Sequence, residues 1–182
     1  MKIFQTIRSL ACAALASAAF AVTASNAVAA TYYYVNWTAA NVAAGTASGT
    51  ITLPDSSVVT VNFQALNADN TPGTLFGAQT SGGTNYWVPS APYVGTTVSN
   101  APPDTDILQL AGGLNQRYRV TLSEAVRDPI MPIVSLGSPG TAITYNFTLP
   151  FTILSQGTGY WGGTSTSLTA LSANVLQGAE GH

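Results

Sequence analysis

The chain has 182 residues, of which 46% are hydrophobic and only 7% are charged. Beyond residue 29 the only cations are Arg117, Arg119 and Arg127, and three arginines against seven acidic residues leave a net charge of −4. Such a chain lacks the basic stripe that phosphate backbones require, so nucleic acid is excluded as a partner.

Residues 1–29 have the pattern of a secretory signal peptide. Lys2 and Arg8 precede an Ala-rich apolar run, and three small residues at 27–29 provide a cleavage site. The run is shorter than the roughly 20 residues that a membrane span needs, so we expect no stable transmembrane segment. We therefore predict a secreted protein whose mature part, residues 30–182, is a single domain without cysteine.

Four stretches of the mature chain alternate apolar and polar residues, as half-buried strands do. Each would turn one dry face to a core and one wet face to solvent. Their apolar faces are, in chain order, Ile51 and Leu53; Val59, Val61, Phe63 and Ala65; Tyr118, Val120 and Leu122; and Ile143, Tyr145, Phe147 and Leu149.

Turn-forming residues separate these stretches at 54–57, 112–115 and 138–140. The best helical candidate, 121–128, is stopped by Pro129 within two turns. Short, half-buried strands joined by such turns are typical of antiparallel sheets packed face to face. The predicted fold is therefore an all-β, antiparallel β-sandwich of the jelly-roll type.

One long irregular segment, residues 81–106, contains four prolines, and long loops on a rigid sandwich are where binding sites usually lie. Sugar-binding sandwiches stack pyranose rings on exposed aromatic side chains beside polar ones. Two Tyr-Trp pairs, Tyr86-Trp87 and Tyr160-Trp161, have this character and are the candidate glycan contacts. The alternative is that these rings pack inside the sandwich, as large aromatics commonly do, and that the protein is purely structural.

Asp104 and Asp106 are the strongest polar pair in the chain. Residues two apart where a loop enters a strand can point at one cation, and Ca²⁺ binds to several oxygens, so the pair is a candidate Ca²⁺ site. The alternative is that Asp104 makes a local turn hydrogen bond and Asp106 begins the strand.

The sequence offers little for catalysis, and we expect a non-enzyme. A Ser or Thr nucleophile needs a basic partner, but the mature chain has no lysine, and its one histidine, His182, is the last residue. His182 lies two residues after Glu180, and no other histidine or cysteine is present to complete a metal site. A glycoside hydrolase that uses two loop carboxylates, such as Glu124 and Asp128, remains the enzymatic alternative.

A resemblance to a known type of protein rests on five stretches of the chain: "GTITLPDSSVVTVNF", "QTSGGTNYW", "NAPPDTDILQLAGG", "DPIMPIVSLGSPGTAITYNFTLPFTILSQGTGYWGG" and "VLQGAEGH". They resemble exported bacterial proteins of the PEP-CTERM, or exosortase-sorted, type over nearly the whole mature chain. The resemblance implies export across the inner membrane and a place on the outer surface or in the extracellular polysaccharide of a Gram-negative bacterium. It brings no catalytic residues with it.

Proteins of that type end in a Pro-Glu-Pro motif, an apolar span and a basic tail, which this sequence lacks. We therefore expect further C-terminal strands and a sorting region to follow residue 182. The prediction as a whole is a secreted, non-catalytic β-sandwich of the cell surface or polysaccharide matrix that binds glycan. A structural protein without a ligand and a hydrolase are the alternatives.

Overall fold

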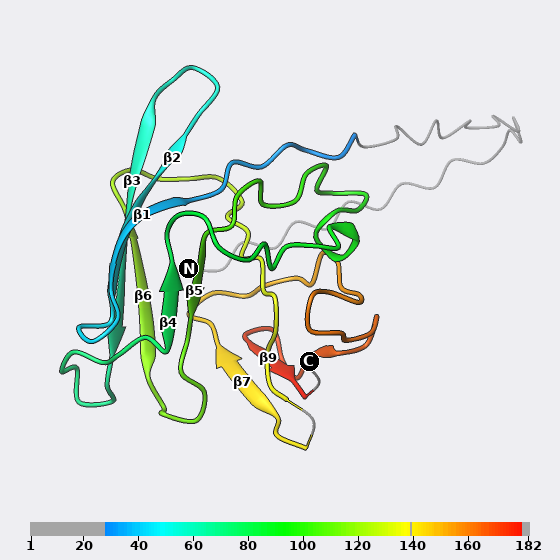
Figure 1. Cartoon of the computed structure of the whole chain (residues 1–182). Helices are drawn as coiled ribbons and strands as arrows, with labels where there is room; N and C mark the ends of the chain where they lie inside the picture. Colours follow the sequence, from blue (N-terminus) through cyan, green and yellow to red (C-terminus); the bar gives the residue numbers. More distant parts are fainter. Residues whose placement is uncertain (1–27, 139, 180–182) are drawn as a thin grey trace, which may run out of the picture.

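The computed structural model describes residues 28–138 and 140–179, and Figure 1 shows that they form antiparallel strands joined by long loops. Glu180, His182 and all but the last two residues of the expected signal peptide lie outside the described residues. No helix in the described ranges is long and apolar enough to cross a membrane.

The largest sheet has four strands in the order β1-β2-β3-β6, all antiparallel. Its strands are β1 (Asn36–Asn41), β2 (Thr46–Thr52), β3 (Val58–Leu66) and β6 (Arg117–Leu122).

The turn between β2 and β3 is the one that the sequence predicts at 54–57. The Ser56 N–H donates to the carbonyl of Leu53 at 2.9 Å, and Ser56 takes a left-handed φ of 68°. The Asp55 carboxylate accepts from the N–H of Ser57 at 3.0 Å and from its hydroxyl at 2.7 Å. A carboxylate that holds the backbone two residues ahead is the usual reason for Asp in such turns.

One face of β3 is the best-buried surface of the chain, as its alternation predicts. Val59, Val61 and Ala65 are at most 1% exposed, and Phe63 is 7% exposed, whereas Thr60 between them is exposed. Burial of these apolar side chains is the main force that fixes the register of this strand, because a slip by one residue would turn them all to solvent.

A second sheet of two strands, β4 (Gly77–Gln79) and β5 (Ile107–Gln109), packs against this buried face. The core cluster consists of Ala47, Phe63, Ala65 and Leu75, with Trp37, Leu108, Leu110 and Tyr118 packed around it. Phe63 lies between two rings: Trp37 meets it edge-on at 6.4 Å, and Tyr118 stacks on it at 5.8 Å between ring centroids.

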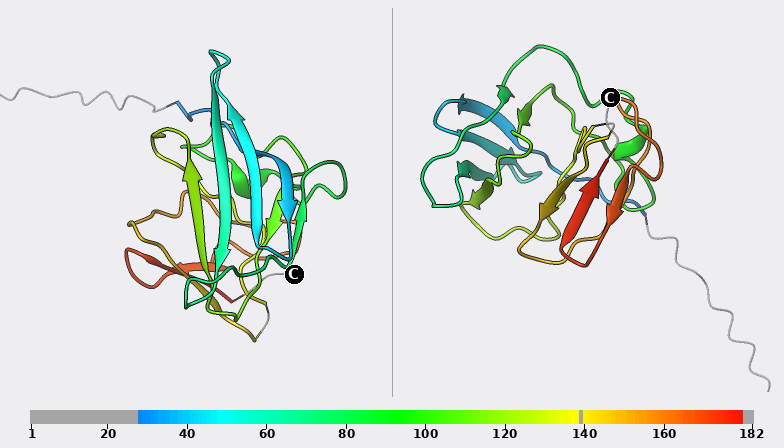
Figure 2. Two further views of the ribbon diagram at one scale, coloured as in Figure 1. Left: turned by 90° about the vertical axis from the view of Figure 1, so that its left-hand side faces the viewer. Right: turned by 90° about the horizontal axis from the view of Figure 1, so that it is seen from below.

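A third sheet has the order β7-β9-β8 and comprises β7 (Ile143–Asn146), β9 (Val175–Gly178) and β8 (Leu168–Ala170). Both views in Figure 2 place it, with β4 and β5, on the same side of the four-stranded sheet. The left view of Figure 2 shows the other face of the four-stranded sheet, and none of the other described segments crosses it. That uncovered face is called the outer face below.

The all-β class is confirmed, and a single short 3₁₀ helix (Ala91–Tyr93) is the only helix among the described residues. Jelly-roll connectivity is not confirmed. Strands β1, β2 and β3 follow one another within one sheet as a meander, and the remaining strands divide between two smaller sheets.

Two inward positions predicted from alternation are wrong. Val120 is 58% exposed on the edge strand β6, because the core cluster packs against Tyr118 of that strand and does not extend to Val120. Leu149 is 73% exposed because the pairing of β7 ends at Asn146 opposite Val175, and the chain reaches Pro150 outside any strand.

The two other predicted turns are present, but neither joins two consecutive strands of one sheet. Residues 112–115 turn with φ of 76° at Gly113 and 49° at Asn115, but they connect strands of different sheets, β5 and β6. Ser138 and Thr141 exchange two backbone hydrogen bonds just before β7, and no strand precedes that turn directly. The helical candidate at 121–128 is not helical, since its first two residues end β6 and residues 123–128 form bends without helical structure.

Candidate functional site

Three of the four aromatic residues predicted to contact glycan lie together, and we call Tyr86, Tyr160 and Trp161 the aromatic cluster. Tyr86 stacks on Trp161 with ring centroids 5.8 Å apart and planes at 19°. Tyr160 meets both rings edge-on, each at 4.9 Å. Rings from two loops more than 70 residues apart in sequence thus form one surface feature.

A tight turn presents two of these rings to solvent. Gly159 and Gly162 exchange backbone hydrogen bonds of 2.7 and 3.1 Å, so Tyr160 and Trp161 are the two residues at the tip of the turn. Tyr160 is 44% exposed and Trp161 is 45% exposed. Both rings therefore stay about half exposed although Tyr86 stacks on Trp161 and Tyr160 contacts it.

The structure corrects the prediction for Trp87. Its side chain is only 7% exposed, its indole N–H donates to the carbonyl of Asp106 at 3.2 Å, and its ring meets Tyr93 edge-on at 5.3 Å. Burial raises the pKa of the Tyr93 phenol in the same place. Trp87 therefore belongs to the interior beneath the loops and offers no ring face to a ligand.

Asp104 and Asp106 are close enough for their charges to interact, but Asp106 is buried and Asp104 is exposed. Asp106 is 9% exposed, and its Oδ2 accepts from the backbone N–H of Trp37 at 2.8 Å. Burial raises the pKa of the Asp106 carboxyl, the Trp37 N–H lowers it, and the negative charge of Asp104 raises it further. Asp104 is exposed and lines a shallow depression that also includes Tyr33 and Asn100.

This arrangement gives Asp106 a structural task, since it connects the start of β1 to the loop that carries Trp87. Within residues 28–138 and 140–179, no three or more His, Cys, Asp or Glu side chains are grouped so that they could hold a metal ion. Calcium binding by Asp104 and Asp106 stays a prediction.

The loop carboxylates Glu124 and Asp128 are exposed in the segment that follows β6. Neither lines the depression that contains Asp104, and neither lines a second shallow depression that lies on the outer face. The hydrolase alternative therefore gains no support from the shape of these surfaces.

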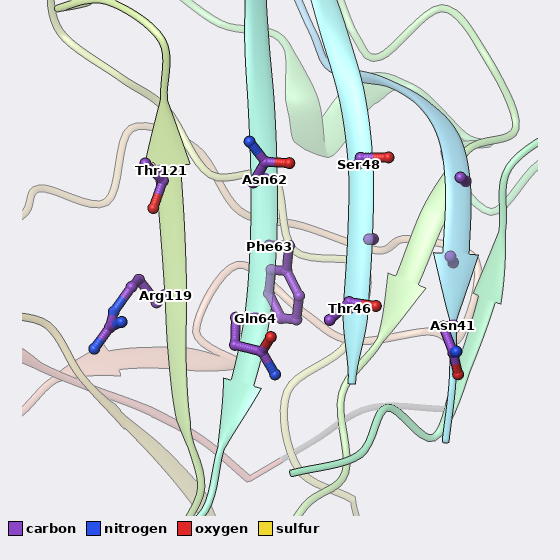
Figure 3. Close-up of a pocket in the computed structure, with 11 residues that line it drawn as sticks. Asn41, Thr46, Ser48, Asn62, Phe63, Gln64, Arg119 and Thr121 are labelled. Atoms are coloured by element: carbon purple, nitrogen blue, oxygen red, sulfur yellow. The ribbon is translucent and has the colours of Figure 1, made fainter. Parts of the chain in front are cut away.

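A feature that sequence reasoning missed lies on the outer face, where a shallow depression of about 470 Å³ crosses four strands. Figure 3 shows its polar side chains, which come from β1, β2, β3 and β6. They are Asn41, Thr46, Ser48, Asn62, Gln64, Arg119 and Thr121. We call this feature the outer-face depression. Alternation alone assigns most of these positions to a wet face, but only strand order brings them together.

No protein-family model matches the chain, and no curated protein or solved structure is significantly similar to it.

Proposed function

We propose that this chain is an exported, non-catalytic protein of the bacterial cell surface or extracellular polysaccharide matrix. We further propose that it binds polysaccharide through the aromatic cluster. Support for export comes from the N-terminal sequence pattern and from the resemblance to exosortase-sorted proteins.

The observation that carries the binding proposal is that Tyr160 and Trp161 are half-exposed at the tip of a turn and that the Tyr86 ring stacks on Trp161. A pyranose ring has faces of C–H groups that pack on an aromatic face, and its hydroxyl groups point outward to polar neighbours. Aromatic surfaces that are rigid before binding lose little conformational entropy when a ligand packs on them. The stacked Tyr86 supplies that rigidity to Trp161.

Tryptophan fluorescence gives a direct test with the full chain. Of the three tryptophans, Trp87 is buried and Trp37 packs against the core, so Trp161 is the one that a bound sugar would contact. We expect neutral polysaccharides such as galactomannan or dextran to change the fluorescence of the wild type. In Trp161→Phe, that change should disappear.

Affinity electrophoresis through gels that contain the same polysaccharide measures the binding itself. Trp161→Ala should weaken binding about tenfold or more, which corresponds to about 1.4 kcal/mol. Phe76→Ala is the matched control, because Phe76 is 70% exposed and makes no ring contact with the cluster. If no polysaccharide retards the wild type, or if both variants behave alike, the rings only hold two loops together and the protein is structural.

A further inference from the structure

The outer-face depression is a regular array because of the register of its strands. Thr46, Gln64 and Arg119 lie directly opposite one another on β2, β3 and β6. Ser48, Asn62 and Thr121 form the next such row, as Figure 3 shows. Neighbouring strands are about 4.8 Å apart, so each row places hydroxyl or amide groups at that interval across the sheet.

Most of these side chains make no hydrogen bond to the protein. The side chains of Thr46, Ser48, Asn62, Thr121 and Arg119 have no partner among residues 28–138 and 140–179. By contrast, the Asp55 carboxylate in the turn between β2 and β3 accepts two hydrogen bonds from Ser57 of the same turn. The outer-face depression therefore concentrates polar groups that are available to a ligand.

The single charge in the depression is positive. Arg119 is exposed, and no Asp or Glu lines the depression with it. Arg117, two residues earlier on the same strand, is engaged differently: its guanidinium donates to the carbonyl of Ala68 at 3.4 Å and to the side chain of Asn70. In a chain with few cations, Arg119 is thus an isolated positive group among neutral hydrogen-bonding side chains.

We propose that the outer-face depression binds an extended polysaccharide that carries carboxylates, that is, a polyuronate. The Arg119 guanidinium would receive a uronate carboxylate, for which arginine has matching paired donors. Sugar hydroxyls would bond to the threonine, serine and asparagine side chains of the two rows. The interval between strands is close to the length of one sugar in an extended chain, so successive sugars meet successive strands.

The shape of the depression agrees with a polymer. Its volume of about 470 Å³ falls within the range of ligand sites, but it is shallow and crosses four strands. A shallow surface covers only one side of any ligand, so useful affinity requires several sugars bound in a row. This surface is separate in sequence from the aromatic cluster, and the inference does not depend on the function proposed for that cluster.

The test compares polygalacturonate with its carboxyl-reduced, neutral form, using the full chain and affinity electrophoresis at low salt. We expect the wild type to bind polygalacturonate at least tenfold more tightly than the reduced polymer. Arg119→Gln should remove that preference, and Asn62→Ala should weaken binding to both forms several-fold. Arg117→Gln is the matched control because it removes the same charge from the same strand, and it should keep the preference.

Three results would overturn the inference. They are equal binding of the two polymers by the wild type, equal effects of Arg117→Gln and Arg119→Gln, and loss of polyuronate binding in Trp161→Ala alone. The last would place the acidic polymer at the aromatic cluster. Of the substituted residues, Asn62, Arg117 and Arg119 lie on the outer face of the sheet, and Trp161 does not. An unchanged urea midpoint for each variant establishes that its fold is intact.

Discussion

Replacing Gly45 with alanine tests how the turn between β1 and β2 is held against the core. Gly45 has a φ of +64°, and a Cβ at this position would lie 2.5 Å from the carbonyl oxygen of Gly73 and 2.9 Å from the Cβ of Ala65. Neither neighbour is the end of a flexible side chain, so the backbone has to move. That movement disturbs the hydrogen bonds from Ala65 N–H to Gly45 O (2.7 Å) and from Gly73 N–H to Ala65 O (2.9 Å).

The expected loss of stability is the sum of three effects. A left-handed backbone costs a non-glycine residue about 1–2 kcal/mol. Two weakened hydrogen bonds cost about 0.5–1.5 kcal/mol each. The smaller entropy of the unfolded chain offsets about 0.4–1 kcal/mol. We therefore expect Gly45→Ala to lower the free energy of unfolding by roughly 2–4 kcal/mol.

Urea unfolding followed by far-UV circular dichroism measures this change, with two other glycines as controls. Gly82 has a φ of +57° and nothing within 4 Å of a built Cβ, so Gly82→Ala carries the backbone effect alone and should cost about 1 kcal/mol. Gly95 has neither feature, so Gly95→Ala should change stability by no more than about 0.5 kcal/mol. If Gly45→Ala costs no more than Gly82→Ala, the contact with Gly73 does not constrain the fold as argued.

Three further outcomes follow from burial and charge. Phe63→Ala should lower the free energy of unfolding by about 3–5 kcal/mol in urea titrations, whereas Val120→Ala, opposite it on the edge strand, should stay within about 0.5 kcal/mol; similar losses would contradict the assigned burial. The raised pKa of the Asp106 carboxyl means that the folded state binds this proton more tightly than the unfolded chain. Its contribution therefore makes stability fall as pH rises from the ordinary value of 3.8 through the raised folded value. Asp106→Asn keeps an acceptor for the Trp37 N–H and should flatten this part of the curve of urea midpoint against pH, and an unchanged slope would refute the assignment. Burial raises the pKa of Tyr145 to about 12, so stability should fall between pH 10.0 and about 12, and Tyr145→Phe should reduce that fall, as measured by the same midpoints.

The strand best predicted from sequence is β3, and the reason is physical. Its alternation runs over the whole strand, and it is a central strand with neighbours on both sides, so its inward residues from Val59 to Ala65 all lie on a covered face, whereas Val58 is exposed. The same pattern in β6 predicts the strand correctly but misplaces Val120. Alternation tells which residues share a face, but it does not tell how far along that face the core extends.

The candidate site was only partly predictable for a related reason. Residue type marks Tyr86, Tyr160 and Trp161 as rings suited to a sugar, but their meeting depends on two loops folding together. The outer-face depression gave no local signal at all, because threonine, serine and asparagine on a wet strand face are ordinary. Its rows arise only when β2, β3 and β6 align in register.

The two Tyr-Trp pairs separate what the sequence by itself determines from what the tertiary structure decides. Composition and alternation determine an all-β chain with neutral polar faces, and its glycines and Asp55 determine where several turns form. The pairs Tyr86-Trp87 and Tyr160-Trp161 are chemically alike, yet Trp87 is buried and Trp161 is half-exposed. The difference lies in what surrounds each ring. Trp87 contacts Tyr93 and a backbone carbonyl in the interior, whereas Trp161 lies at the tip of a turn, where the rings of Tyr86 and Tyr160 pack against it.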